Sequence, residues 1–476
     1  MKFLYKSRFI FFLGLFWLSI SCAHALSIDD KSHLNQTQVD QIIKVPQKDH
    51  LEFLKSIIKL AKLKKIPLSL KGTQHSQGGH SFFKDAWVLD LSSLNQMQMI
   101  QNRIIRVQTG AKWKDVLDFL NDKSLSVSVM QSDYDFSIGG TLSTNVHGWQ
   151  VNKQPLIHTV LGFHILLADG TYHYCSREQN SDIFKAAIGG YGLLGVIIDV
   201  DLDVVENSLY HLQQWVVETS DFQHKFLTHV IQNPKAALFF ARFSCDSKNF
   251  LKNIIFNVYE KESEMSSNTT LSSHRWLHGS VNYLFSLTYQ SDFFKNMRWY
   301  IESNTFLKSF YSHMSRNALM YHSVDNYIIK HEDYTDLLQE FFIPLENFDK
   351  FVRFLQSLQP DMINSLMNIT VRHVRQDQES ILNYAERDRL AFVMYFRGKK
   401  DADFDQKLKN LVVKITDYAL ALGGNYYLPY RGYQTLEQFK KSYPKAALFK
   451  QIKLKYDPQE IFINQFYDRY FKDLTF

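Results

Sequence analysis

The stretch that decides the fold is Ser137-Ile138-Gly139-Gly140-Thr141-Leu142-Ser143-Thr144-Asn145-Val146-His147-Gly148. Two adjacent glycines are followed by small hydroxyl residues and then by a His-Gly pair. Small side chains let a backbone run close beneath a flat ligand, because no long side chain holds the ligand away. A β-turn at the two glycines is the alternative that explains the pattern without a ligand.

Glycine is concentrated in one region of the chain. Of its 19 glycines, 13 lie between Gly72 and Gly195, and only six lie elsewhere in the 476 residues. Glycine adopts backbone conformations that are closed to other residues and allows close approach to a ligand. This distribution is typical of a cofactor-binding region that precedes a region shaping the substrate site.

A second block, Lys71-Gly72-Thr73-Gln74-His75-Ser76-Gln77-Gly78-Gly79-His80, follows a strand expected at 67–71. Such a loop can turn consecutive N–H groups toward a phosphate. It lacks the Gly-Lys-Ser/Thr sequence of a P-loop. His75 and His80 are of a type that binds metals, but no acidic or Cys partner stands at a suitable spacing, so no metal site is predicted.

A third block contains Gly190, Gly192 and Gly195, which have the Gly-x-Gly-x-x-Gly spacing of a dinucleotide-binding turn. In a Rossmann fold this motif follows a strand and opens a helix. Here an expected helix at 180–187 precedes it and an expected strand at 196–205 follows it. The block therefore predicts a tight helix-to-strand turn, either purely structural or pressed against a flat ligand.

Hydrophobic spacing predicts a mixed α+β fold. In the glycine-rich part, helices are expected at 49–65, 112–121 and 180–187, and strands at 67–71, 87–91, 103–108, 160–168 and 196–205. After residue 208 glycine is rare and aromatic residues are frequent. There, helices are expected at 345–358 and 404–422, and strands at 365–374 and 389–396.

The first 25 residues predict a secretory signal peptide. A charged start is followed by an apolar stretch and a cleavage sequence: Lys2, Lys6 and Arg8, then Phe9 to Ile20, then Ala23-His24-Ala25. An uncleaved anchor and a lipid on Cys22 are the alternatives. We expect a periplasmic or secreted protein. Its remaining Cys175 and Cys245 are too few for a disulfide framework and are expected to be buried thiols.

The composition excludes a disordered protein and argues against a nucleic-acid-binding one. With 45% hydrophobic, 15% aromatic and 21% charged residues, the chain is too apolar to be disordered. Its net charge of +6 falls to +3 without the first 25 residues, which hold three bases and no acid. A nearly neutral body argues against nucleic acid as a partner. The aromatic stretch 276–300 is interpreted as a domain core rather than a membrane-binding surface.

Taken together and in this order, four blocks resemble the FAD-binding domain of the vanillyl-alcohol oxidase/p-cresol methylhydroxylase (PCMH-type) superfamily. They are Gly72-Thr73-Gln74-His75-Ser76, Gly139-Gly140-Thr141-Leu142-Ser143 with His147-Gly148, Leu167-Ala168-Asp169-Gly170 with Asn180, Asp182 and Phe184, and Gly189 to Ile197. The similarity covers about residues 40 to 207, and Lys455-Tyr456-Asp457-Pro458 to Asn464 resembles the closing segment of these enzymes. The whole chain is most similar to the branch of sugar-lactone oxidases, alditol oxidases and cytokinin dehydrogenases.

The resemblance implies two α+β subdomains that clamp an extended FAD and an α+β cap domain over the flavin. It divides the chain into 1–25 (signal peptide), 38–207 (PCMH-type FAD-binding domain), 208–435 (substrate or cap domain) and 436–476 (a segment returning to the FAD domain). The implied FAD-binding residues are Gly72, Thr73, Gln74, His75, Ser76, Gly139, Gly140, Thr141, Ser143, Thr144, His147, Gly148, Val196, Ile197 and Asn464. Many relatives bond FAD covalently to the histidine of the first loop, which is His75 here, and His80 is the alternative.

Flavin chemistry implies hydride transfer from a C–H bond to the flavin N5, with a protein group taking the proton. Arg372, in the strand 365–374, matches an arginine of alditol oxidases that faces the flavin. The glutamate two residues before it there is Thr370 here. The His-Trp-Gly-Lys signature is replaced by Tyr426-Tyr427-Leu428-Pro429-Tyr430-Arg431. We expect Arg372, Tyr430 and Arg431 to hold polar groups of the substrate.

The expected function is oxidation of a CH–OH group of a polar, carbohydrate-like small molecule, with oxygen, or a quinone or cytochrome, as electron acceptor. Two alternatives remain open. One is amine oxidation of the cytokinin-dehydrogenase type, in which Asp133 or Asp135, before the glycine pair, would be the base, although its spacing is about one residue short. The other is a flavin-binding protein without turnover.

Overall fold

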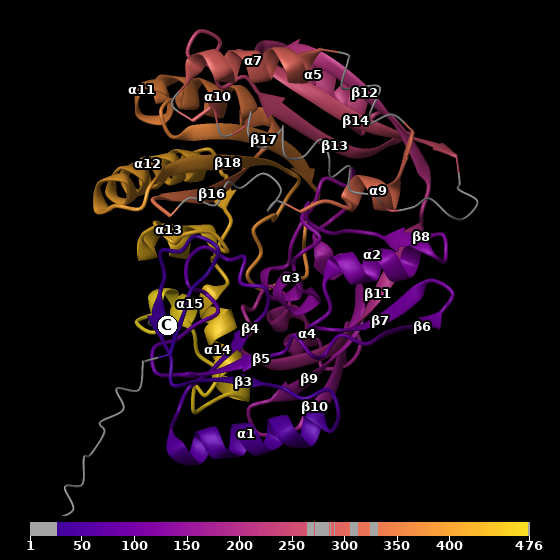
Figure 1. Cartoon of the computed structure of the whole chain (residues 1–476), viewed down its shortest axis with the longest axis vertical. Coiled ribbons are helices and arrows are strands. Elements are labelled where there is room, and N and C mark those ends of the chain that lie inside the picture. Colours follow the sequence, from indigo (N-terminus) through magenta and orange to yellow (C-terminus); the bar gives the residue numbers. More distant parts are fainter. Residues whose placement is uncertain are drawn as a thin grey trace, which may run out of the picture.

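A computed structural model of the chain has two halves that face each other, one built around two sheets and the other around a single large sheet (Figure 1). It describes residues 26–263, 271, 285, 287–289, 291–304, 313–323 and 332–474. The predicted signal peptide, residues 1–25, lies outside this range, as does much of the aromatic stretch 276–300. The mixture of helices and strands confirms the predicted α+β class.

The first half begins with a small parallel sheet of strand order β3 (Gln41–Lys44), β5 (Trp87–Asp90) and β4 (Leu68–Lys71). Helix α1 (His50–Lys64) joins β3 to β4 and buries Leu54, Ile58 and Ala61. These residues repeat at helical spacing, which is why the segment folds as a helix with one apolar face. Before the sheet, β1 (Ser27–Ile28) pairs with β2 (Thr37–Gln38).

A second, antiparallel sheet completes this half. Its order is β10 (Tyr172–Ser176), β9 (Val160–Leu167), β11 (Gly195–Glu206), β7 (Ile104–Gln108) and β6 (Met97–Gln101), and β8 (Leu125–Val127) also pairs with β11. Helices α2 (Trp113–Asn121), α3 (Ile138–Thr144) and α4 (Ser181–Ala187) connect the strands. The glycine motif at 190–195 follows α4 and opens β11, which confirms the predicted helix-to-strand turn.

The glycine pair of the fold-deciding stretch lies in a helix. Gly139 and Gly140 belong to the first turn of α3, so the β-turn alternative is wrong. The Ser137 hydroxyl accepts a hydrogen bond from Gly140 N at 3.3 Å and begins the helix as its N-cap. A serine cap offsets the poor helix propensity of two glycines because it satisfies an otherwise unpaired N–H group.

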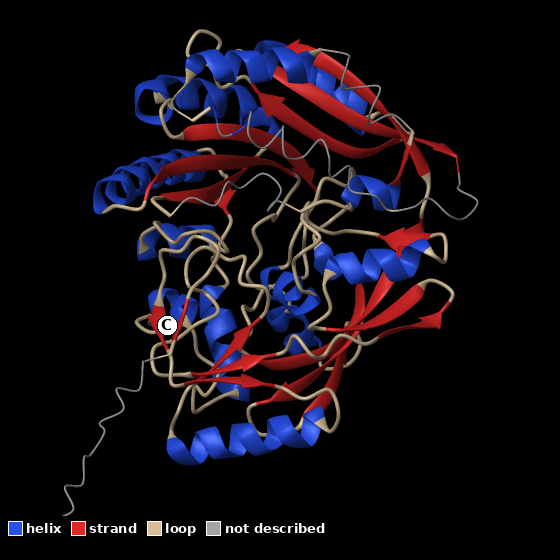
Figure 2. Ribbon diagram, in the orientation of Figure 1, coloured by secondary structure: helices blue, strands red, loops and turns tan. Residues whose placement is uncertain are grey.

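The second half is built on one sheet of eight strands. Its order is β15 (Met314–Ser315), β12 (Leu209–Glu218), β14 (Asn253–Ser263), β13 (Ala236–Phe243), β17 (Leu366–Val374), β18 (Arg389–Lys399), β16 (Tyr334–Ile343) and β19 (Asn425–Tyr426). Helices cover it: α5 (Phe222–Phe226), α7 (Asp292–Ser303), α9 (Arg316–Met320), α10 (Phe348–Ser357), α11 (Gln359–Met362) and α12 (Ala402–Ala421) (Figure 2). We call this half the cap. None of the helices in the described residues combines the length and the apolar character needed to cross a bilayer.

The two faces of the cap sheet have different neighbours. On one face, aromatic rings of α5 and α10 pack at a tilt against rings of the strands, as Phe348 does against Phe392. On the other face, alternate residues of six strands point into a cavity. This alternation follows from the two-residue period of a strand, and it places one buried core and one functional surface on the same sheet.

The end of the chain runs back to the first half. Helices α13 (Leu436–Ser442), α14 (Ala446–Tyr456) and α15 (Gln465–Tyr470) follow the cap. Between the last two, Phe462 forms a parallel bridge with Leu68 of β4, and Ile463 N donates to Leu68 O at 2.9 Å. The C-terminal segment therefore extends the small parallel sheet beside the loop that starts at Gly72.

Candidate active site

A cavity of about 650 Å3 lies between the two halves. The first half contributes backbone and small side chains from residues 72–77 and 140–147. The cap contributes alternate residues of six strands: Leu212, Gln214, Phe240, Arg242, Ile255, Asn257, Tyr259, Asn368, Thr370, Arg372, Val393, Tyr395, Asp336, Leu338 and Glu340. Glycine, threonine and serine on one wall leave room for a planar group, and charged and amide groups on the other can orient a polar ligand.

The loop after β4 interlocks with the start of α3. A Cβ at Gly72 would lie 2.5 Å from Ser137 Oγ, so only glycine fits there without displacing the helix cap. Thr73 completes the joint, because its Oγ1 accepts a hydrogen bond from Ser137 N at 3.1 Å. Two blocks that are far apart in sequence are thereby held as one rigid wall of the cavity.

His75 lies on this wall. Its ring stacks on Phe136 with centroids 4.0 Å apart, and its Nδ1 lies 3.7 Å from Asp133 Oδ2. Both side chains are buried and border the cavity. His80, the alternative attachment residue, lies elsewhere: burial, followed by the charge of Arg469, lowers its pKa to about 3, and its ring packs near Tyr191 and Phe466.

A short polar contact between the two halves at the cavity joins His147 to Glu340. Nε2 of His147 lies 2.7 Å from Oε1 of Glu340, and the two residues are only 6% and 2% exposed. Nδ1 of His147 lies 3.3 Å from Gly148 O. Each ring nitrogen therefore faces an oxygen.

Tyr430 stands beside this pair. Burial, and then the Glu340 carboxylate that its hydroxyl bonds, raise the pKa of Tyr430 well above its usual range. Its phenol stays protonated at any working pH, so it is a hydrogen-bond donor. The neighbouring Tyr427 and Tyr384 hydroxyls donate to Thr144 O at 2.9 Å and Asn145 O at 2.7 Å, which ties the cap to α3.

Arg372 reaches across the cavity from β17. Its Nη2 donates to Ser132 Oγ at 2.8 Å. Among the described residues no carboxylate lies within ion-pair distance of it, unlike Arg242 and Arg298, which both hold Glu302. The guanidinium therefore keeps donors for a ligand.

The structure brings only some of the predicted site residues to the cavity. Those that line it are Gly72, Thr73, Gln74, His75, Ser76, Gly140, Thr144, His147, Asp133, Arg372 and Tyr430. Those that do not are Gly139, Thr141, Ser143, Gly148, Val196, Ile197, Asn464 and Arg431. Most of the second group support the first through α3, β11 and α15.

Arg431 and Asn464 illustrate the structural roles of predicted site residues that do not line the cavity. Arg431 Nε pairs with Asp405 at 2.8 Å and its Nη1 donates to Asn35 at 3.1 Å, so its side chain points away from the cavity that Tyr430 lines. Asn464 caps α15 and its Nδ2 donates to Tyr191 O at 2.8 Å, which fixes the C-terminal segment to the glycine turn at 189–195.

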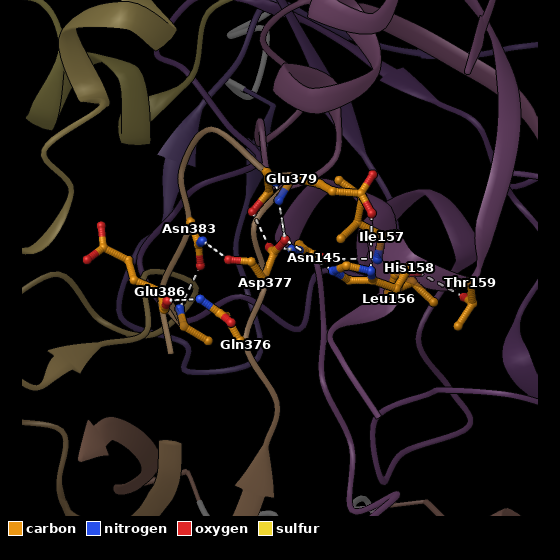
Figure 3. A network of polar contacts seen from close by, with 12 residues as sticks. Asn145, Leu156, Ile157, His158, Thr159, Gln376, Asp377, Glu379, Asn383 and Glu386 are labelled. Atoms are coloured by element: carbon orange, nitrogen blue, oxygen red, sulfur yellow. Dashed lines mark hydrogen bonds and ion pairs between the residues drawn. The ribbon is translucent and has the colours of Figure 1, made fainter. Parts of the chain in front are cut away.

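A polar network joins the cap to the first half next to the cavity (Figure 3). The loop between β17 and β18 places Asp377 beside Asn145, whose Nδ2 donates to Asp377 Oδ2 at 3.1 Å. His158 lies between Asp377 at 3.4 Å and Glu379 at 3.1 Å. The loop thus fixes Arg372's strand relative to His147.

Glu340 is the site residue that sequence reasoning missed. It lies in β16, which was not recognised as a strand, with Leu337, Leu338, Phe341 and Phe342 around it. A carboxylate in such an apolar segment was the available signal, since charged residues are rarely buried without a partner.

Comparison with known proteins gives matches to two families. The family described as "FAD binding domain" matches residues 47–176, and the one described as "D-arabinono-1,4-lactone oxidase" matches residues 244–470. L-gulonolactone oxidase of Bos taurus is 22% identical over 436 residues, which are 89% of this chain and 94% of that protein. Cytokinin dehydrogenase 3 of Arabidopsis thaliana is 30% identical over 169 residues, 33% of this chain and 31% of that protein.

Together with the cavity between the two halves, these matches define the class of protein: an FAD-dependent oxidoreductase with a PCMH-type cofactor domain. Within that class the chain is similar to sugar-lactone oxidases, because its cap matches the D-arabinono-1,4-lactone oxidase family and the L-gulonolactone oxidase match runs over both halves. The cofactor is FAD, and the cavity fits it. One wall includes Gly72, Thr73, Ser76, Gly140 and Thr144, whose small side chains leave room for a planar group beside the backbone.

Proposed function

We propose that the protein oxidises a CH–OH group of a polar, carbohydrate-like molecule. When bound, FAD accepts the hydride and its electron pair. The observation that carries the proposal is the meeting, in one cavity, of a small-residue wall with the Arg372 guanidinium and the His147–Glu340 pair. Arg372 would donate hydrogen bonds to substrate hydroxyl or carbonyl oxygens, and the oxygen of Tyr430, whose hydrogen is given to Glu340, would accept one from a substrate hydroxyl. These contacts would hold the reacting carbon toward the small-residue wall.

The first experiment is anaerobic mixing of the purified holoenzyme with a panel of sugar lactones, alditols and aldoses. We expect at least one compound to bleach the flavin absorbance. With air admitted, we expect hydrogen peroxide to form, since the relatives named above include oxidases. A parallel assay with a quinone analogue and with cytochrome c compares the other acceptors. A flavin that no panel compound reduces, while dithionite does, would contradict the proposal.

A second candidate is amine oxidation of the cytokinin-dehydrogenase type. Asp133, buried at the cavity beside His75, favours it, as does the similarity to cytokinin dehydrogenases over about a third of the chain. An adenine carrying an N6-alkenyl group is the diagnostic compound. This candidate requires that Asp133→Asn abolish its turnover, and it is lost if the compound leaves the flavin oxidised.

We also propose that His75 carries FAD covalently. Supporting it, the ring borders the cavity, Phe136 holds its plane, and the Asp133 carboxylate near Nδ1 makes the imidazole more nucleophilic. A covalent bond would keep the cofactor on an exported enzyme.

Export itself is proposed from residues 1–25. Expression with this segment should give a periplasmic or secreted product that starts at Leu26. Intact-mass measurement of that fraction tests the proposal, and a product that retains Met1 would overturn it.

A further inference from the structure

Two carboxylate–histidine contacts lie at the cavity among the described residues, and the His147–Glu340 pair, at 2.7 Å, is closer than the His75–Asp133 pair at 3.7 Å. We propose that Glu340, held by His147, takes the hydroxyl proton of the substrate as its C–H hydride leaves to FAD. This inference rests on the proposed CH–OH oxidation. The O–H bond breaks and its proton binds Glu340. The C–H bond breaks with its electron pair, which goes to FAD, and the freed O–H electrons form the C=O bond.

In the part of the chain that the structure describes, three other carboxylates line the cavity, and each has partners of its own. Glu302 is held by Arg242 at 3.0 Å and Arg298 at 2.8 Å. Asp336 accepts a hydrogen bond from the Tyr395 hydroxyl at 2.7 Å. Asp133 accepts from Asp135 N at 3.0 Å and lies beside His75.

The strand register favours Glu340 over Asp336 as the residue that takes the substrate proton. Glu340 pairs with Val393 of β18 and Asp336 with Arg397, whereas Arg372 of β17 pairs with Ala391 of the same strand. At about 3.4 Å per residue, Glu340 is displaced from the level of Arg372 by about 7 Å along the strands and Asp336 by about 20 Å. The Arg372 guanidinium and the Glu340 carboxylate can therefore act on one small substrate, and both charges act on the Tyr430 hydroxyl.

The pair can hold the proton that it receives. The His147 ring faces Glu340 through Nε2 and Gly148 O through Nδ1, so it can carry one proton or two. Since both side chains are buried, bulk water does not compete for their hydrogen bond. Tyr430 cannot serve as the acceptor because its pKa is already raised by burial and by Glu340.

The test compares holoenzyme variants in stopped-flow reduction by whichever panel compound bleaches the wild-type flavin. Glu340→Gln keeps the size and one acceptor but removes the base. We expect it to retain FAD and its reduction by dithionite, to bind the compound within about threefold, and to reduce about 10²–10⁴-fold more slowly. Glu346→Gln, an exposed change outside the cavity, is the matched control and should keep the wild-type rate.

The pH dependence of the flavin reduction rate distinguishes a proton-accepting role of Glu340 from a purely structural one. The titratable groups that interact with Glu340 among the described residues are His147, Tyr430, Tyr427, Tyr384 and Tyr443. The charge of Arg372 acts on the Tyr430 hydroxyl. The wild-type reduction rate should fall at acid pH, and this acid limb should vanish in Glu340→Gln. If that variant fails to fold, His147→Gln should move the same limb.

The outcomes separate the inference from the function on which it rests. If no compound bleaches the wild-type flavin, the proposed function fails. If a compound does and Glu340→Gln is bleached at the wild-type rate with an unchanged acid limb, the function stands and the assignment of Glu340 is overturned.

Discussion

Asn145 and Asp377 are joined by a side-chain hydrogen bond of 3.1 Å, although they come from opposite halves of the molecule. Asn145 ends α3 in a left-handed conformation, two residues before His147. Asp377 belongs to the loop that follows the strand of Arg372. This bond is therefore one of several that hold the two walls of the cavity together.

Asp377→Asn should destabilise the protein in a pH-dependent way. Burial alone would raise the pKa of Asp377, but hydrogen bonds from His158, Ser380 and the backbone outweigh it and hold the pKa below its usual value. The ionised form is thus the one that stabilises the fold. Its contribution is complete above the unfolded pKa of about 3.9 and is lost as the pH falls below it.

We expect Asp377→Asn to lose about 1–3 kcal/mol in the free energy of unfolding at pH 7 and less at pH 3. Urea denaturation at the two pH values measures this. Asp203→Asn, at an exposed strand position, should be close to wild type at both. A deficit that is equal at pH 7 and pH 3 would contradict the assigned role of the carboxylate.

Arg372→Ala should weaken substrate binding. Loss of a charge-assisted hydrogen bond of about 1.5–3 kcal/mol corresponds to a fall of about 10- to 100-fold in kcat/KM, mainly through KM. Steady-state kinetics with the best panel compound measure it. Arg375→Ala is the control, because Arg375 lies just past the same strand, is exposed and pairs with Asp388 at 3.2 Å. Equal effects of both changes would argue against a substrate contact by Arg372.

Acid precipitation tests the bond to His75. We expect the flavin of the wild-type protein to stay in the pellet, and that of His75→Ala to pass into the supernatant. His80→Gln should behave as wild type, because His80 is packed away from the cavity. A yellow supernatant from the wild-type protein would show that FAD is bound noncovalently.

Lys453→Met should be strongly destabilising. Lys453 and Asp457 form an ion pair with both side chains fully buried, and Asp457 also accepts hydrogen bonds from Ile461 N and Phe462 N. Removing the lysine leaves a buried charge without its counter-ion, which costs about 3–5 kcal/mol. Thermal and urea unfolding measure the loss.

The exposed pair Lys407–Asp403 has the same spacing and provides the control. Lys407→Met should cost less than about 1 kcal/mol. The double change Lys453→Met with Asp457→Asn should recover part of the loss, because the buried charge is gone. No recovery would mean that packing, rather than charge, makes Lys453 necessary.

Local patterns predicted the first half well. The helix α1, the strands β4, β5, β7, β9 and β11, and the non-Rossmann turn at 190–195 all follow from residue spacing and glycine placement. The helical conformation of the glycine pair at 139–140 was harder to predict. It depends on the hydrogen bond to the Ser137 cap, which is a contact in the folded protein, whereas glycine itself has a low helix propensity. Buried thiols were predicted for Cys175 and Cys245, and both are buried and free.

The cap could be predicted only in part, because its sheet pairs strands that are far apart in sequence. β17 lies between β13 and β18, and β16 lies beyond β18, so no local pattern places Glu340 near His147. Tyr430 and Arg431 are adjacent in sequence, yet one lines the cavity and the other pairs with Asp405. Which neighbour faces inward depends on tertiary contacts that the sequence alone does not reveal.

The bridge between Phe462 and Leu68 also sets an order of events during synthesis. The cofactor loop follows β4, which begins at Leu68, and Phe462, the bridge partner of Leu68, is among the last residues made. A ribosome that has not yet reached Asn464 holds a chain whose glycine turn at 189–195 lacks its C-terminal anchor. The glycine turn and β4 therefore gain these contacts only after residues 462–464 have been made, and we expect a chain that ends before residue 461 to lack them.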